Sequence, residues 1–113
     1  MSMRPGRYDI TIERGTTYDQ EFTFRLNGDL VDLSGFTGSM DFRRAPNSED
    51  VDLAVTSENG RLQIGGADGT VRVLITADDT EAISMRLGSY RLDLVSPDGT
   101  VRSWLKGKVA IID

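Results

Sequence analysis

The chain reads Tyr8-Asp9-Ile10-Thr11-Ile12-Glu13 near its start and Glu21-Phe22-Thr23-Phe24-Arg25-Leu26 a little later, with Gly15 between the two stretches. In both stretches an apolar residue occupies every second position, which is the period of a β-strand with one buried face. A helix would space its apolar residues three and four positions apart. These residues therefore predict two half-buried strands, and they set the fold class.

The same alternation recurs through most of the remaining chain, in residues 36–42, 51–55, 62–64, 71–75 and 90–94. Turn-forming residues separate these stretches, because Asn, Asp and Gly tolerate positive φ and Pro fixes a turn. The turns are Asn27-Gly28-Asp29, Glu58-Asn59-Gly60, Gly65–Gly69 and Pro97-Asp98-Gly99. We expect a hairpin across Asn59-Gly60 that joins residues 51–55 to 62–64, and a mobile loop over residues 44–50, which are polar and contain a proline.

One segment departs from the strand period. Thr76-Ala77-Asp78-Asp79 has the composition of a capped helix start, with acidic residues near the positive end of the helix dipole. We expect one short helical turn there. Without crossover helices a parallel βαβ arrangement is excluded, so residues 8–113 are predicted to form a single all-β domain, an antiparallel sandwich of seven to nine strands.

The composition narrows the classes of function. The 113 residues contain 13 Lys and Arg against 18 Asp and Glu, a net charge of −5, and no His or Cys. This charge disfavours nucleic acid and anionic membranes as partners. The missing residue types remove thiol nucleophiles, imidazole bases and the usual zinc and iron ligands. We therefore predict a protein that is not an enzyme and that carries no cofactor and no metal.

Three local clusters could carry chemistry, and each has a structural interpretation that we favour. The acidic runs 49–52 and 78–81 lack the alternating ligands of a calcium loop and suit a solvated loop and a helix N-terminus. The glycine-rich stretch 65–69 lies between two strands, whereas a phosphate-binding loop precedes a helix. Arg43-Arg44 together with Arg25 could form a small basic patch, although such residues usually pair with carboxylates at a sheet rim.

The last stretch, residues 100–112, is apolar on both faces. Val101, Leu105, Val109 and Ile111 share one parity, whereas Trp104, Ala110 and Ile112 share the other with Arg102, Lys106 and Lys108. With Gly107 near its middle, this pattern indicates either a bulge that swaps faces or burial on both sides. We expect this strand to lie at or beside an interface formed by Trp104, Arg102, Lys106 and Lys108.

Residues 1–7 show no strand pattern. They carry Arg4 and Arg7 and no acidic residue, whereas the body that follows is distinctly acidic. We predict a flexible basic N-terminal arm over residues 1–7. In an assembly, Arg4 and Arg7 could contact the acidic face of a neighbour, and an arm without any role is the alternative.

Several motifs in their order resemble a family of small virion proteins of tailed bacteriophages. They are Gly15, Val31-Asp32-Leu33-Ser34-Gly35-Phe36-Thr37, Asn59-Gly60, Ala77-Asp78-Asp79-Thr80, Gly88-Ser89-Tyr90-Arg91-Leu92-Asp93-Leu94 and Asp98-Gly99-Thr100. The chain is also similar to the immunoglobulin-like N-terminal domain of phage baseplate upper proteins. The resemblance implies an immunoglobulin-like sandwich with a structural role and transfers no catalytic residue. Because the sequence ends at Asp113, attachment of fibres through a C-terminal extension is not expected.

These observations predict a virion structural protein, an adaptor or accessory protein of the tail or baseplate. It would be made in the bacterial host cytoplasm and bind other virion proteins in multiple copies. A capsid decoration protein is the alternative within that class. A small carbohydrate-binding module that uses Trp104 is the alternative outside it.

Overall fold

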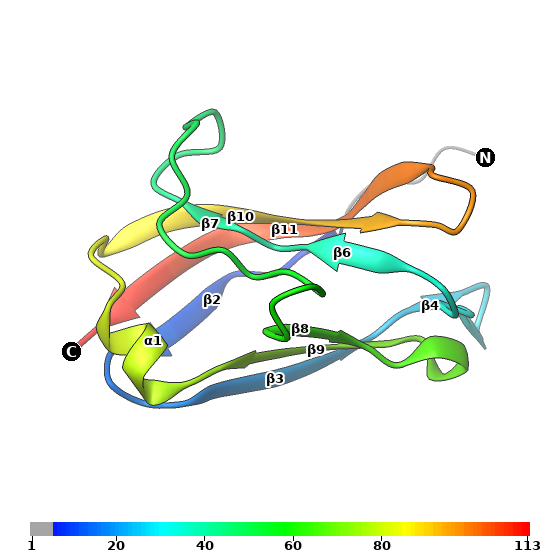
Figure 1. The fold of residues 1–113 in the computed structure, drawn as a ribbon, viewed down its shortest axis with the longest axis horizontal. Coiled ribbons are helices and arrows are strands. Elements are labelled where there is room, and N and C mark those ends of the chain that lie inside the picture. Colours follow the sequence, from blue (N-terminus) through cyan, green and yellow to red (C-terminus); the bar gives the residue numbers. More distant parts are fainter. Residues whose placement is uncertain (1–5) are drawn as a thin grey trace.

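Two β-layers enclose one apolar core in the computed structural model, which describes residues 6–113 (Figure 1). The upper layer in this view contains β10 and β11, and the lower layer contains β3, β8 and β9. In chain order the elements are β1 (Gly6–Arg7), β2 (Ile10–Glu13), β3 (Tyr18–Thr23), β4 (Arg25–Leu26), β5 (Asp29–Leu30), β6 (Thr37–Ser39), β7 (Phe42–Arg43), β8 (Leu62–Ile64), the 3-10 turn η1 (Gly66–Asp68), β9 (Thr70–Ile75), α1 (Ala77–Glu81), β10 (Leu87–Val95) and β11 (Val101–Ile112).

The upper layer is built on the β10–β11 hairpin, whose antiparallel register runs from Leu87 opposite Ala110 to Val95 opposite Val101. On one side of the hairpin, β6 and β7 pair antiparallel with β10. On the other side, β1 and β2 pair with β11 in parallel. A predominantly antiparallel sandwich was expected, and these two parallel pairings are the exception. In both pairings the N-terminal strand lies along the edge of β11 and runs in the same direction.

The lower layer has β9 at its centre, with β3 and β8 antiparallel on its two sides. Next to this layer, β4 and β5 form a separate two-stranded hairpin. Asn27 and Gly28 connect them with φ of 54° and 87°. Positive φ at both central residues matches a type I′ turn, the hairpin connection that an Asn-Gly pair favours. The turn predicted at Asn27-Gly28 is confirmed.

The alternation read from the sequence accounts for the core. In β9 every second residue is buried, and β10 buries Tyr90, Leu92 and Leu94 in the same way. Side chains at alternate positions of a strand point to one face of the sheet, so these rows face each other across the sandwich. The largest fully buried side chains are Phe42, Ile12, Leu33, Met40, Leu62, Ile75, Ile83, Met85, Leu92 and Leu94.

Two expected strands differ in the structure. Residues 36–42 were expected to form one long strand, but it is divided into β6 and β7 around Met40 and Asp41. Residues 51–56 make only isolated bridges, from Leu53 to Phe42 of β7 and from Thr56 to Ser39 of β6, so the hairpin predicted across Asn59-Gly60 is wrong. Instead the Met40 amide donates to the Val55 carbonyl, and Asp41 accepts from the Val55 amide. Such breaks explain why residues 6–113 contain eleven strand segments rather than seven to nine.

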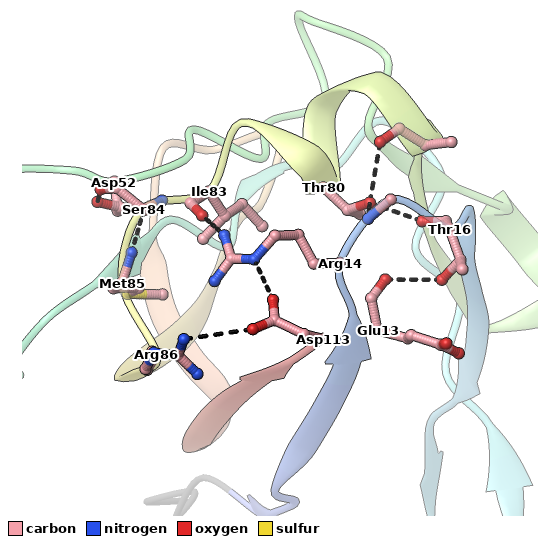
Figure 2. Close-up of polar contacts among 12 residues, drawn as sticks. Glu13, Arg14, Thr16, Asp52, Thr80, Ile83, Ser84, Met85, Arg86 and Asp113 are labelled. Atoms are coloured by element: carbon pink, nitrogen blue, oxygen red, sulfur yellow. Dashed lines mark hydrogen bonds and ion pairs between the residues drawn. The ribbon is translucent and has the colours of Figure 1, made fainter.

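The predicted helical turn is present as α1. Thr76 precedes it in an extended conformation, and its side chain accepts a hydrogen bond from the Asp79 amide, which confirms the expected N-cap. Within α1, Thr80 is fully buried and fastens the turn to the segment after β2 (Figure 2). Its hydroxyl oxygen accepts from the Gly15 amide at 3.1 Å and donates to the Thr16 carbonyl at 2.7 Å. The helix therefore closes one end of the sandwich.

The end of the chain is fastened beside α1. Arg14 donates to the Asp113 carboxylate at 2.8 Å and to the Ile83 carbonyl, and Arg86 donates to the same carboxylate at 3.2 Å (Figure 2). These two guanidinium groups hold the pKa of Asp113 below its ordinary value, with the Arg14 hydrogen bond as the larger cause. Across residues 6–113, no helix has the length and apolar character needed to span a membrane.

Candidate protein-docking groove

A groove of about 770 Å³ lies on the outer face of the upper layer. Its floor consists of outward side chains of β10 and β11, because the intervening residues of both strands point into the core. The register sets these floor residues in transverse rows. One row contains Arg43, Ser89 and Lys108, and the next contains Arg91, Lys106 and Arg7.

The loop of residues 44–50 forms one wall of the groove. Figure 1 shows the chain after β7 rising above the outer face of the upper layer. Arg43 holds the loop by donating to the Ser48 carbonyl at 3.0 Å and the Glu49 carbonyl at 3.1 Å. These two bonds attach the loop to Arg43, which belongs to the first basic row.

Asp52 fastens the far end of this loop to the segment that enters β10. Its carboxylate accepts from the Ser84 amide at 3.2 Å and from the Ser84 hydroxyl at 3.0 Å (Figure 2). Arg44 adds a bond to the Ser84 hydroxyl at 3.0 Å and lies 3.7 Å from the Asp52 carboxylate. The wall of the groove is thus attached at both ends. The sequence predicted a loop here, and its mobility stays a prediction.

The groove is basic in an acidic protein. Within residues 6–113, six of the twelve Lys and Arg residues line it, but only two of the eighteen Asp and Glu residues do, so the rest of this part of the chain carries sixteen acidic against six basic residues. The lining cations are Arg7, Arg43, Arg44, Arg91, Lys106 and Lys108, and the lining carboxylates are Asp41 and Asp93. This separation of charge gives the groove a local field opposite in sign to that of the whole molecule.

Some of these cations are paired and others are not. Asp93 lies 2.9 Å from Arg91, and Asp41 lies 3.8 Å from Arg43. Within residues 6–113, no carboxylate forms an ion pair with Arg7, Lys106 or Lys108. These three residues are exposed and occupy adjacent strands, so they present a cluster of uncompensated positive charge.

The structure divides the predicted interface residues between two faces. A register shift in the β10–β11 ladder places Leu92 opposite Leu105 but Asp93 opposite Ser103, so Trp104 is the extra residue of a β-bulge. The bulge is one of the two alternatives that the sequence left open. It turns Trp104 inward, away from Lys106 and Lys108, which remain outward in the groove. The expectation that one face carries all three residues is wrong.

Trp104 belongs to the margin of the core. Its ring meets Phe24 edge-on at 5.4 Å between centroids and Phe36 at 6.4 Å, and it is half-buried. Arg102 stands beside it at a shallow hollow of about 80 Å³, outside the basic groove. Edge-to-face aromatic contacts of this kind stabilise packing. Trp104 therefore has a packing role, and Arg102 is separated from the lysines.

The N-terminal residues are also divided. Arg7 lies in β1, which pairs with β11 opposite Lys106, so Gly6 and Arg7 join the sheet rather than the predicted arm. The Tyr8 amide donates to the Lys106 carbonyl at 3.0 Å and continues this attachment. Arg4 and the other residues of 1–5 lie outside the described part of the chain. The predicted arm is therefore described only at its end.

Buried Tyr90 supports the groove from below. Its hydroxyl donates to the Tyr8 carbonyl, which fastens the link between β1 and β2 to the upper layer. Burial, together with the nearby Tyr18, Asp9 and Tyr8, raises the pKa of Tyr90 well above its ordinary value, so the phenol stays protonated and can donate this bond at neutral pH.

Sequence reasoning missed Arg91 and separated residues that the structure brings together. Arg43 and Arg44 were noted as a possible patch with Arg25, but Arg25 lies in β4 and donates to the Gly28 carbonyl. The alternation could have placed Arg91 outward with Lys106, because both occupy polar positions in strands of a predicted hairpin. The described residues contain no cluster of three or more Asp or Glu side chains suited to a metal ion.

Comparisons with known proteins bear on the fold. No protein-family model matches the chain, and no curated protein matches it in sequence. Its structure is similar to that of the extracellular domain of the voltage-gated sodium channel β4 subunit, whose parallel homodimers are described as explaining its role in cell–cell adhesion. The TM-score is 0.51 at 12% identity over 100% of this chain and 97% of that chain.

A second similar structure comes from work on multimeric cell-adhesive interactions of sodium channel β subunits. Its TM-score is 0.51 at 13% identity, over 100% of this chain and 98% of that chain. At these identities the likeness concerns the fold alone. With the two packed layers described above, it identifies the chain as an all-β protein with an immunoglobulin-like sandwich.

Proposed function

We propose that this protein is a non-enzymatic structural component of a bacteriophage virion, an adaptor or accessory protein of the tail or baseplate. It acts through protein–protein contacts, in several copies per particle, after synthesis in the host cytoplasm. The observation that carries the proposal is the basic groove on a rigid sheet face of an acidic molecule. A preformed, charged surface of this kind suits the orientation of a partner better than it suits chemistry on a small substrate.

Two further points support the proposal. The motifs that resemble phage virion proteins extend over most of the chain, from Gly15 to Thr100. The sodium channel β4 domain, which has a similar fold, forms homodimers connected with adhesion, so a sandwich of this shape can present a face for protein contacts. The carbohydrate-binding alternative depended on Trp104, and its contacts with Phe24 and Phe36 give that alternative no support.

The test is the presence and position of the protein in purified particles. Particles from a culture that produces the protein are separated into tail and capsid fractions and analysed by quantitative mass spectrometry. We expect the protein in the tail fraction, at more than one copy per tail. Recovery in the capsid fraction would instead favour a decoration protein, and absence from washed particles would overturn a virion role.

A further inference from the structure

The outward residues of β11 change character along the strand. Lys106 and Lys108 are followed on the same face by Ala110 and Ile112, because Val109 and Ile111 point into the core. Leu87 pairs with Ala110 and is 70% exposed, and Ile112 is 49% exposed. The strip on this face therefore runs from two cations to a small apolar patch of Leu87, Ala110 and Ile112, which we call the apolar end.

Large exposed apolar side chains beside unpaired charges are typical of surfaces that bind another protein. Leu87 also lines the groove itself, so the apolar end is continuous with the basic rows. The spacing along the strip is regular, since outward residues of a strand recur about every 6.8 Å. An extended segment that lies along β11 has the same repeat in its own side chains.

On these grounds we propose that the groove binds an extended acidic segment of a partner protein. The segment carries carboxylates at two alternate positions, which face Lys106 and Lys108, and apolar side chains at the next alternate positions, which cover the apolar end. Arg7 and Arg91 flank the first carboxylate from the neighbouring strands. This inference rests on the proposed function and adds the chemistry of the partner.

The charge distribution favours a short protein segment over a long polyanion. Outside the groove, residues 6–113 carry sixteen acidic against six basic residues, so a DNA duplex or an anionic membrane that extends past the groove would meet repulsion. An alternating segment satisfies both parts of the strip, whereas a polyanion leaves Leu87 and Ile112 uncovered.

The test uses the full chain and synthetic peptides. The first peptide has two Glu followed by two Leu at alternate positions, separated by Ser, and the second has the same composition with the two Glu adjacent and the two Leu adjacent. Binding is measured by fluorescence anisotropy at low and moderate salt. We expect the alternating peptide to bind about tenfold more tightly than the block peptide, and its affinity to fall as salt screens the lysines.

Matched variants locate the binding. Lys106→Glu/Lys108→Glu should weaken the alternating peptide about tenfold or more, because like charges then face its carboxylates. Arg102→Glu lies on the same strand outside the groove and should change affinity less than about twofold. Thermal unfolding checks that each variant is folded. If Lys106→Glu/Lys108→Glu does not fold, Lys106→Gln/Lys108→Gln takes its place.

Each other outcome overturns the inference. Equal binding of the two peptides would show that the alternating order of their side chains does not matter. Unchanged peptide binding by the lysine variants would show that the groove is not the binding site. Tighter binding of a short DNA duplex that displaces the peptide identifies a polyanion site, and lysine-dependent self-association in sedimentation identifies a second copy as the occupant. Peptide binding is measured on the isolated chain, whereas the proposed function is tested by detecting the protein in purified particles. A negative peptide result would therefore overturn this inference without overturning the proposed function.

Discussion

At the scale of single residues, Gly107 controls how closely the start of the chain approaches β11. It pairs with buried Tyr90, and its missing side chain leaves room for the Tyr8 carbonyl, which accepts the Tyr90 hydrogen bond. A Cβ at this position would lie 2.0 Å from the Tyr8 oxygen. The sequence linked Gly107 to a bulge, but the bulge lies at Trp104, and Gly107 permits close backbone contact instead.

Gly107→Ala should lower the free energy of unfolding by about 1–3 kcal/mol, the usual cost of overpacking against atoms that cannot move freely. Urea denaturation measures this value. Gly6→Ala is the matched control, because its Cβ would meet a flexible Leu105 side-chain atom at 3.3 Å and the Trp104 carbonyl at an ordinary contact distance of 3.8 Å. Equal stability of the two variants would show that the Tyr8 segment is not held against β11.

Asp98 links stability to pH at the turn between β10 and β11. The Ser96 hydroxyl and then the Thr100 amide hydrogen-bond its carboxylate and lower its pKa to about 2. A folded pKa below the unfolded value means that the carboxylate stabilises the fold above about pH 4, and that this stabilisation is lost as the pH falls towards 2.

We therefore expect Asp98→Asn to lower stability at neutral pH and to flatten the loss of stability between about pH 4 and pH 2. Chemical denaturation at a series of pH values measures both effects. Asp29→Asn is a control at another hairpin, because within residues 6–113 the Asp29 side chain accepts no hydrogen bond from a neighbouring group. Parallel pH profiles of the wild type and Asp98→Asn would refute the linkage.

At the scale of elements, the sequence predicted what is local. The strands around residues 10–13 and 70–75, the Asn27-Gly28 turn and the Thr76 cap each depend on residues that are close in the chain, and all are confirmed. It did not predict that residues 51–55 would hydrogen-bond with residues 40–42 without forming a regular strand. It also did not predict the parallel pairing of β1 with β11. These two features depend on contacts between segments that are distant in the sequence.

The candidate site shows the same division. Exposure of Lys106 and Lys108 follows from alternation along one strand and could be predicted. Their convergence with Arg7, Arg43 and Arg91 depends on the register of four strands, which the sequence does not reveal. The bulge at Trp104 shifts parity by one residue, so a correct alternation pattern led to a wrong face for that residue.

Trp104→Ala should lower the free energy of unfolding by about 2 kcal/mol, less than the usual 3–5 kcal/mol for a fully buried Trp, because the ring is half-buried. Urea denaturation measures the change, with Val101→Ala as a control at a residue 61% exposed on the same strand. Partner or peptide binding by the folded variant should persist. Lost binding with unchanged stability would restore Trp104 to an interface.

Thr80→Val tests how α1 is attached. Valine keeps the shape of threonine but removes the hydroxyl that bonds Gly15 and Thr16, leaving two backbone groups without these partners. Loss of a partner for a buried polar group costs about 1–3 kcal/mol. Urea denaturation against Thr80→Ser, which keeps the hydroxyl, separates the bond from the methyl group. If Ser is as destabilising as Val, packing rather than hydrogen bonding holds α1.

At the scale of the whole molecule, the basic groove and the acidic remainder give the protein an asymmetric distribution of charge. Such a molecule can associate in one orientation, because an acidic partner is attracted to the groove and repelled elsewhere. Attraction between exposed charges weakens with salt over a Debye length of about 8 Å at physiological ionic strength. Assembly through the groove should therefore depend on salt more than the stability of the isolated sandwich does.

The central claim, that the groove is the surface by which this chain joins a virion, is tested most directly by incorporation of variants into particles. Lys106→Glu/Lys108→Glu and Arg102→Glu are each produced in place of the wild type, and their copies per purified particle are counted by quantitative mass spectrometry. We predict about a tenfold loss for the lysine variant and near-normal incorporation of Arg102→Glu. Normal incorporation of a folded lysine variant would contradict the claim.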